Sequence, residues 1–243
     1  MAILAFLVHG VFPMTDFAFP PPAAPSAEIA GSGQRFPIHR IYCVGRNYAD
    51  HVREMGGDIE REPPVFFSKP ADAVVANDAS IPYPPRTSNF HHEIELVVAI
   101  GRAGRDIQQE RALDYVFGYA SGNDLTRRDL QAASKQKGLP WDTSKGFDYS
   151  APLAAIRPAS RGHVSKGRIW LAVNGQLRQE SDVSEMLWSV PEVIAELSTL
   201  FELKPGDLIY TGTPAGVGVL KPGDKLEGGV EGLDVLRSTI AAR

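Results

Sequence analysis

The sequence predicts a β-rich α+β domain. Three observations support this class: many short apolar segments are bounded by Pro, Gly or Asp, only two segments have the pattern of substantial helices, and strands and helices do not alternate regularly. A doubly wound parallel sheet would require that alternation. The length of 243 residues fits one principal β-rich core, although a chain of this length also allows two domains.

Residues 1–38 are expected to form an irregular N-terminal arm, and residues 39–243 the compact domain. Residues 18–37 are rich in Pro, Ala, Gly and Ser, a composition typical of irregular chain. The apolar stretch 2–12 is too short to span a bilayer and lacks a basic leader, so neither a membrane span nor a signal peptide is expected. Met14 offers an alternative translation start, and we hypothesise that residues 1–13 are a mis-called extension.

The compact domain is expected to begin with a strand and a helical turn. Residues 39–48, HRIYCVGRNY, give an apolar strand that ends at Gly45, and residues 50–56 continue as a helical turn stopped by Gly56 and Gly57. Short strands follow within residues 63–70 and 72–81. Residues 90–101, FHHEIELVVAIG, predict a strand rich in β-branched residues and closed by Gly101.

Two helices and a hairpin are expected further along the chain. Residues 124–138 predict a helix with Asp124 as its N-cap and Gly138 as its stop. Asn174-Gly175 lies between two alternating segments and indicates a β-hairpin. Residues 189–207 hold the second helix, which ends before a Pro-Gly turn, and residues 208–214, LIYTGTP, begin the last strands.

Composition and charge argue against nucleic acid as a partner. The apolar fraction is 43%, the charged fraction 22%, the formal net charge −4 and the pI about 5.9, values of an ordinary globular protein without a basic footprint for nucleic acid. The lone Cys43 cannot form an internal disulfide and is expected to be a buried small apolar residue. A reducing cytoplasm fits this cysteine usage best.

Glu93 and Glu95 are the first unusual feature of the sequence. The two-residue period of a strand places both carboxylates on one face, where like charges raise a pKa unless a cation or several donors lie between them. A solvated edge strand would carry the same pattern. Val97 and Ala99 continue that face with apolar side chains, which indicates burial and therefore a compensating partner.

Asp124 and the pair His51 and Glu54 supply further candidate groups. Asp124 is explained by itself as a helix cap, but a cap can also face a site, and an all-carboxylate set suits Mg²⁺ or Mn²⁺. His51 and Glu54 lie three apart on a helical turn, so the carboxylate can orient the imidazole as a general base. A surface helix often carries such a pair without any function.

Other familiar catalytic motifs are absent from the sequence. It contains no G-x-S-x-G, H-E-x-x-H or Walker lysine loop, and the Gly-rich stretch GTPAGVGVLKPG lacks the G-x-G-x-x-G spacing.

Several segments in order resemble the fumarylacetoacetate hydrolase family, in particular its acylpyruvate hydrolase branch. The matching segments within residues 39–240 include GRNYADHVREMG, HHEIELVVAIG, GNDLTRRDLQ, SKGFDYSAP and LKPGDLIYTGTPAGVG. The resemblance implies a mixed β-sheet roll or barrel-like core, a homodimer and a Mg²⁺ or Mn²⁺ site. It implies that Glu93, Glu95 and Asp124 hold the metal and that His51 and Glu54 activate water. It also implies that Lys145 stabilises a leaving enolate. The remaining residues are implied to surround the substrate: Lys69 and Gln131 line the site, and Thr211 contacts a substrate carboxylate.

The resemblance implies hydrolysis of the carbon–carbon bond of a 3-acylpyruvate. Fumarylpyruvate is the expected substrate, as in gentisate-type aromatic catabolism, because Arg46, Arg127 and Arg128 flank the site and Arg46 or Arg128 can pair with a second carboxylate. These arginines also fit the 2-oxo acid carboxylate, a dimer interface or solvent. Two alternatives stay open, an oxaloacetate decarboxylase on the same scaffold and a non-catalytic metal-stabilised binding protein.

Overall fold

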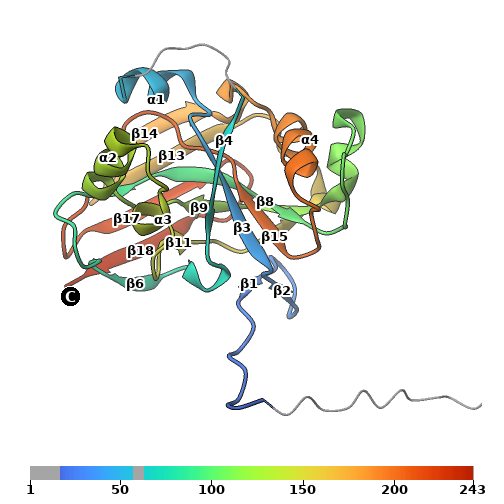
Figure 1. The fold of residues 1–243 in the computed structure, drawn as a ribbon, viewed down its shortest axis with the longest axis horizontal. Helices are drawn as coiled ribbons and strands as arrows, with labels where there is room; N and C mark the ends of the chain where they lie inside the picture. Colours follow the sequence, from blue (N-terminus) through green and yellow to red (C-terminus); the bar gives the residue numbers. More distant parts are fainter. Residues whose placement is uncertain (1–16, 57–62, 243) are drawn as a thin grey trace, which may run out of the picture.

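A computed structural model describes residues 17–56 and 63–242 of the protein (Figure 1). Its largest sheet has six strands in the order β12 (Arg157–Pro158), β9 (Val116–Asn123), β8 (Ile94–Ile100), β15 (Asp207–Tyr210), β3 (Arg40–Gly45) and β4 (Val65–Lys69). The pairing of β15 with β3 is parallel, and the pairings of β12 with β9, β9 with β8, β8 with β15 and β3 with β4 are antiparallel. The sheet is therefore mixed, as predicted.

A second sheet of five strands packs against the first. Its order is β14 (Gln176–Asp182), β13 (Arg168–Val173), β17 (Lys225–Val230), β18 (Leu236–Ala241) and β6 (Ala79–Pro82). The predicted hairpin joins β13 to β14, where Asn174 and Gly175 have φ of 53° and 77°, the positive values that a tight hairpin turn requires.

Three small sheets complete the β-structure of the described part of the chain. They pair β1 (Ser26–Glu28) with β2 (Arg35–Pro37), β7 (Phe90–His92) with both β10 (Thr126–Arg127) and β16 (Gly218–Val219), and β5 (Val74–Val75) with β11 (Ala151–Pro152). Over the described residues no sheet closes on itself, so the core is a roll of open sheets.

In residues 17–56 and 63–242, four α-helices and four 3₁₀ helices lie around the sheets. The α-helices are α1 (Ala49–Glu54), α2 (Arg128–Lys137), α3 (Asp142–Lys145) and α4 (Val190–Leu200); the 3₁₀ helices are η1 (Ala71–Ala73), η2 (Gln109–Tyr115), η3 (Ala159–Arg161) and η4 (Val183–Glu185). In Figure 1, α1, α2 and α3 gather on one side of the molecule and α4 lies on the other. In the part of the chain that the structure describes, no helix is long and apolar enough to cross a bilayer.

The helix predicted over residues 124–138 begins later than expected. The helix α2 runs from Arg128 to Lys137 and is capped by Gly138, whose φ of 63° confirms the predicted stop. Asp124 is therefore not its N-cap, because Thr126 and Arg127 form the short strand β10 between them. This frees the Asp124 carboxylate for another role.

Two hydrophobic clusters sandwich the central strand β8. Leu96 and Val98 belong to the larger cluster, which β13, β17 and α4 also line, while the alternate residues Val97 and Ala99 belong to the smaller one. Both faces of β8 are thus buried, as the apolar side chains beyond Glu95 predicted.

The N-terminal arm differs from the prediction of irregular chain over residues 18–37. The strands β1 and β2 form an antiparallel hairpin, and Ala27, Phe36 and Ile38 are buried in the smaller cluster. Phe36 packs against Phe117 with ring centroids 5.1 Å apart. Residues 1–13 lie outside the described residues, so the hypothesis of a mis-called start stays a prediction.

Candidate active site

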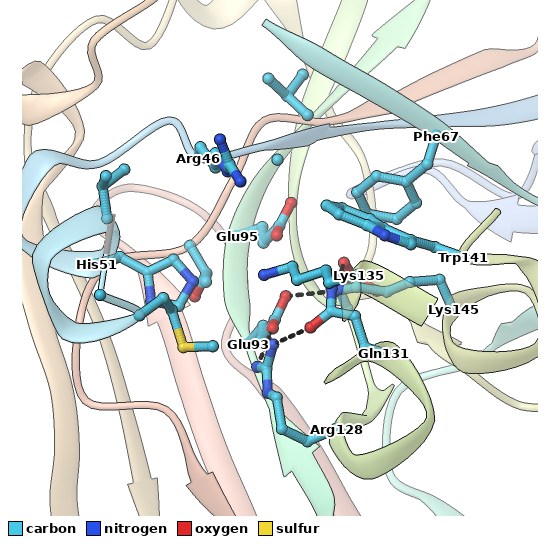
Figure 2. Close-up of a pocket in the computed structure, with 17 residues that line it drawn as sticks. Arg46, His51, Phe67, Glu93, Glu95, Arg128, Gln131, Lys135, Trp141 and Lys145 are labelled. Atoms are coloured by element: carbon cyan, nitrogen blue, oxygen red, sulfur yellow. Dashed lines mark hydrogen bonds and ion pairs between the residues drawn. The ribbon is translucent and has the colours of Figure 1, made fainter. Parts of the chain in front are cut away.

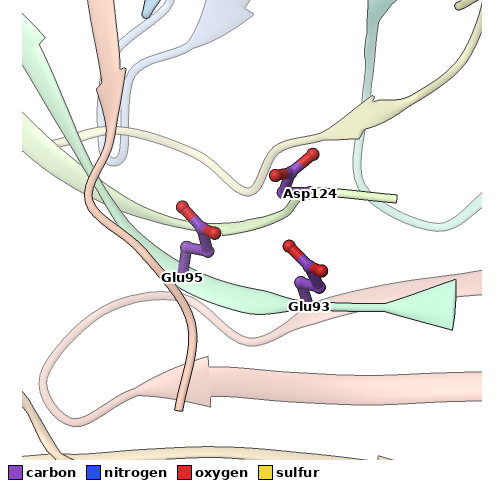
Figure 3. A group of neighbouring side chains, drawn as sticks. All are labelled: Glu93, Glu95 and Asp124. Carbon is purple, nitrogen blue, oxygen red and sulfur yellow. The ribbon is translucent and has the colours of Figure 1, made fainter. Parts of the chain in front are cut away.

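Two neighbouring strands bring the three candidate metal ligands together. Glu93 lies between β7 and β8, Glu95 lies on β8, and Asp124 directly follows β9. Ile94 pairs with Asn123 across the two strands, and the Asp124 N–H donates to the Glu93 carbonyl at 2.8 Å. The carboxylates consequently converge, with ligand oxygens all within 4.8 Å of one another (Figure 3).

Three buried cations neutralise part of this acidic cluster. Lys145 Nζ donates to Glu93 Oε2 at 2.7 Å and to Asp124 Oδ2 at 2.5 Å, and the Arg128 guanidinium donates to Glu93. Lys69 Nζ lies 2.8 Å from Asp124 Oδ1. Burial by itself would raise the pKa of Glu93, but the charges of Lys145 and Arg128 hold that pKa well below its ordinary value.

Among the described residues, Glu95 has no cation partner of its own. Its carboxylate accepts a hydrogen bond from the Gly212 N–H at 2.9 Å, and the described residues place no Lys or Arg in ion-pair contact with it. Burial, followed by the negative charges of Asp124 and Glu93, raises the pKa of Glu95 well above its ordinary value. The three cations of the site are thus directed at Glu93 and Asp124, and none of them pairs with Glu95.

These features fit a divalent metal ion. The Asp124 Oδ1 atom is buried without a well-aligned hydrogen-bond donor, and Glu95 is repelled by its two neighbours. A set of three carboxylates is the donor chemistry that Mg²⁺ and Mn²⁺ prefer, and it leaves coordination positions for water or substrate.

A pocket of about 160 Å³ opens beside the carboxylates (Figure 2). The acids Glu93, Glu95 and Asp124 line its buried end. Side chains from several elements form its walls, namely Arg46, His51, Val52, Met55, Phe67, Arg128, Gln131, Lys135, Trp141, Lys145 and Thr213. Arg46 lies at the end of β3 with a positive φ of 62°.

The predicted His51 and Glu54 pair is formed on α1. His51 Nδ1 lies 3.1 Å from Glu54 Oε2, and the Gly216 N–H donates to the same carboxylate at 3.0 Å. Burial lowers the pKa of His51 below its ordinary value, against the opposing effects of Glu93 and of the Glu54 hydrogen bond. With Nδ1–H assigned as the donor to Glu54, the neutral imidazole presents Nε2 as a proton acceptor.

Three predicted residues are not among the described lining residues of the pocket: Glu54, which contacts His51, and Lys69 and Thr211, which lie beside the pocket. Lys69 is fully buried behind Asp124, where its ammonium also donates to the carbonyls of Leu125 and Lys145. Thr211 donates its hydroxyl to the Leu96 carbonyl at 2.9 Å. Both side chains support the site from outside the cavity.

Sequence reasoning missed several lining residues, among them Phe67, Lys135, Trp141 and Thr213. Thr213 lines the pocket two residues after Thr211, and its Oγ1 accepts from the buried Gln179 at 2.7 Å. The i, i+3, i+7 spacing of Arg128, Gln131 and Lys135 on α2 is the signal that would have identified Lys135.

Known proteins share this fold and much of this sequence. Residues 40–241 match the family described as fumarylacetoacetate (FAA) hydrolase, C-terminal. The chain is 45% identical over 188 residues to a fumarylpyruvate hydrolase of a Ralstonia species, covering 76% of this chain and 98% of the relative. It is 46% identical over 194 residues to the mitochondrial oxaloacetate tautomerase of Homo sapiens, covering 79% of this chain and 87% of the relative.

Solved structures give the same result. The crystal structure of fumarylpyruvate hydrolase from Pseudomonas aeruginosa, in complex with Mn²⁺ and pyruvate, superimposes with a TM-score of 0.92 at 50% identity and covers 94% of this chain and 100% of that one. With the family match spanning nearly the whole described domain, the chain belongs to the fumarylacetoacetate hydrolase family.

Proposed function

We propose that this protein hydrolyses the carbon–carbon bond of a 3-acylpyruvate, converting fumarylpyruvate and water to fumarate and pyruvate. The observation that carries the proposal is the placement of a neutral, carboxylate-oriented histidine and a three-carboxylate cluster in one pocket. Similarity to two fumarylpyruvate hydrolases, one of them crystallised with Mn²⁺ and pyruvate, supports the substrate.

Glu93, Glu95 and Asp124 would hold the metal ion. When bound, Mg²⁺ or Mn²⁺ supplies a Lewis acid for the oxygens of a 2-oxo acid.

His51 performs the proton transfer that begins the reaction. Its Nε2 removes a proton from water, and the water oxygen attacks the distal keto carbon of the substrate. Glu54 holds the ring and stabilises the imidazolium that forms, and Gly216 N–H keeps Glu54 in place. The bond between that carbon and the pyruvate methylene then breaks, its electron pair leaves with pyruvate as the enolate, and a proton on the methylene carbon completes pyruvate.

Lys145 is positioned to stabilise the developing negative charge. Burial by itself would lower the pKa of Lys145, but the carboxylates of Asp124 and Glu93 raise it above its ordinary value. The ammonium therefore stays charged and lines the pocket. Arg128 and Gln131 are hydrogen-bonded to each other at 2.6 Å and form the adjoining wall, where they bind substrate. Lys69 and Thr211 act by positioning Asp124 and β8.

The runner-up function is oxaloacetate chemistry on the same site. The chain is 46% identical to the human oxaloacetate tautomerase, against 45% and 50% for two fumarylpyruvate hydrolases. It is 42% identical to an oxaloacetate decarboxylase of Dictyostelium discoideum. Decarboxylation requires no attacking water, so the oriented His51 favours hydrolysis over it. Tautomerisation also uses a base, so the presence of His51 does not distinguish it from hydrolysis. Analysis of the products separates the two reactions.

A substrate panel tests the proposal. Purified protein with Mn²⁺ or Mg²⁺ is assayed against fumarylpyruvate, acetylpyruvate, fumarylacetoacetate and oxaloacetate, with products identified by chromatography. We expect fumarylpyruvate to have the highest kcat/KM and to yield fumarate and pyruvate in equal amounts. Turnover of oxaloacetate without hydrolysis of any acylpyruvate would refute the hydrolase assignment. A homodimer and a cytoplasmic location stay predictions, which sedimentation analysis and cell fractionation test.

A further inference from the structure

The wall of the pocket formed by α2 carries a lysine that the hydrolytic steps do not use. Arg128, Gln131 and Lys135 occupy successive turns of one face of the helix, and all three line the pocket. The Arg128 guanidinium donates to Glu93 and to the side-chain oxygen of Gln131. Lys135 is one turn further from Glu93, and Figure 2 shows its side chain extending into the pocket.

Lys135 differs from the other lysines of the site in its partners. Lys145 and Lys69 each contact a buried carboxylate, whereas within residues 17–56 and 63–242 no acid lies in ion-pair contact with Lys135. Its Nζ instead lies 5.3 Å from the centroid of the Trp141 ring. Among the described residues, no carboxylate forms an ion pair with this positive charge in the pocket.

The surroundings of Lys135 favour an incoming anion. The residue as a whole is exposed, but its ammonium end is partly buried in the pocket, and this burial, followed by the positive charges of Arg128 and Arg46, lowers its pKa. A carboxylate between these cations would remove their mutual repulsion. Solvent also reaches this end of the pocket, so an anion need not lose all of its hydration.

Two aromatic rings form a flat wall beside the lysine. Trp141 directly precedes α3 and Phe67 lies on β4, with ring centroids 5.6 Å apart and planes inclined by 57°. Flat apolar surfaces of this kind pack well against a planar conjugated chain. The wall lies between Lys145 and Lys135, since Lys145 Nζ is 5.0 Å from the Phe67 ring and Lys135 Nζ is near the Trp141 ring.

We propose that Lys135 binds the distal carboxylate of the acyl group while Trp141 packs against its planar chain, so that this pair selects acylpyruvates that carry a second carboxylate. The inference rests on the proposed function, because it assumes that the 2-oxo acid end binds at the carboxylate cluster. It assigns the anchor to Lys135 in place of Arg128, whose guanidinium already pairs with Glu93 and Gln131.

The test replaces Lys135 with methionine in the full-length, Mn²⁺-loaded protein. Lys137→Met is the matched control, because it removes the same charge from the same helix. Lys137 is exposed and does not line the described pocket. The readout is the ratio of kcat/KM for fumarylpyruvate to that for acetylpyruvate. We expect Lys135→Met to lower this ratio about tenfold, mainly through the KM of fumarylpyruvate, and Lys137→Met to leave it unchanged. An unchanged ratio in Lys135→Met overturns the inference.

A binding measurement separates failure of this inference from failure of the proposed function. Calorimetry compares fumarate with crotonate, which has the same planar chain but one carboxylate, in the wild type and in both variants. We expect the Kd of fumarate to rise about tenfold in Lys135→Met and the preference for fumarate over crotonate to disappear. If the wild type hydrolyses no acylpyruvate, the proposed function fails and the fumarate result still decides the role of Lys135. Equal fumarate affinity in the wild type and Lys135→Met, or no fumarate binding by the wild type, overturns it.

Discussion

Replacing Glu95 with glutamine is expected to stabilise the metal-free protein while abolishing its metal binding. The ligand oxygens of Glu93, Glu95 and Asp124 lie within 4.8 Å of one another, and Coulomb's law with an effective dielectric constant of about 20 gives about 3.5 kcal/mol of repulsion for each such pair of unit charges. Glu95 meets two such charges, so its gross repulsion is about 7 kcal/mol.

Favourable contacts of Glu95 offset part of this repulsion. Lys145 attracts the carboxylate and the Gly212 N–H donates to it at 2.9 Å, a bond that a glutamine oxygen can also accept. At a pH at which Glu95 is ionised in the folded protein, we expect a net gain of about 2 kcal/mol in the free energy of unfolding, within the range observed when buried charges are replaced by neutral groups. For a chain of this length that gain corresponds to a rise in Tm of about 4–8 °C.

The gain should depend on pH in a defined direction. Because the pKa of Glu95 is raised in the folded protein, the folded state keeps a proton there that the unfolded chain releases above about pH 4.3. The stability contributed by this protonated carboxyl is fully present below that pH and is lost as the pH rises through the raised, folded-state pKa. Glutamine has no such proton to lose, so the Tm difference should widen with rising pH.

Thermal denaturation with chelator and with added Mn²⁺ measures both effects. The exposed Glu110→Gln variant controls for the loss of one negative charge. Mn²⁺ should raise the Tm of the wild type and of Glu110→Gln and leave Glu95→Gln unchanged, because a ligand stabilises only the state that binds it. A Glu95→Gln protein that melts below the wild type in chelator at neutral pH, or that gains as much from Mn²⁺, would refute the reasoning.

Three further changes are predicted from the structure. His51→Ala should lower the rate of hydrolysis by about 10²-fold or more while calorimetry still detects metal binding, and an unchanged rate would contradict the role of His51. In the wild type, the acid limb of the pH profile of kcat/KM should lie below about pH 6.5, because burial lowers the pKa of His51. Phe36→Ala should destabilise the fold by about 3 kcal/mol in urea titrations, whereas the exposed Phe19→Ala should be neutral; equal effects would show that the hairpin does not pack. The NMR titration of His91 should have its midpoint near pH 4, since burial and then Arg128 lower its pKa to about 4, and a midpoint near 6.5 would contradict this environment.

Local chemistry allowed much of the fold to be predicted from the sequence. The Asn174-Gly175 turn and the Gly138 helix stop were identified because each depends on a residue that adopts positive φ. The hairpin of β1 and β2 was missed because its strands have three residues each, too few for a periodic pattern. Phe36 is stabilised by Phe117, a contact that no local signal encodes.

The sequence by itself determined the reactive groups of the candidate site, whereas the tertiary structure decided their partners. The spacing of Glu93 from Glu95, and of His51 from Glu54, places each pair together because strands repeat every two residues and helical neighbours lie three apart.

Asp124 reaches the acids through the register of β8 and β9 and not as a helix cap. Lys145 neutralises Glu93 across 52 residues of chain, and Lys135 enters the pocket without an acid in ion-pair contact among the described residues. Charge balance in a buried site depends on distances between groups that are far apart in the sequence. Strand register and helix placement set these distances, and the spacing of residues along the chain does not contain them.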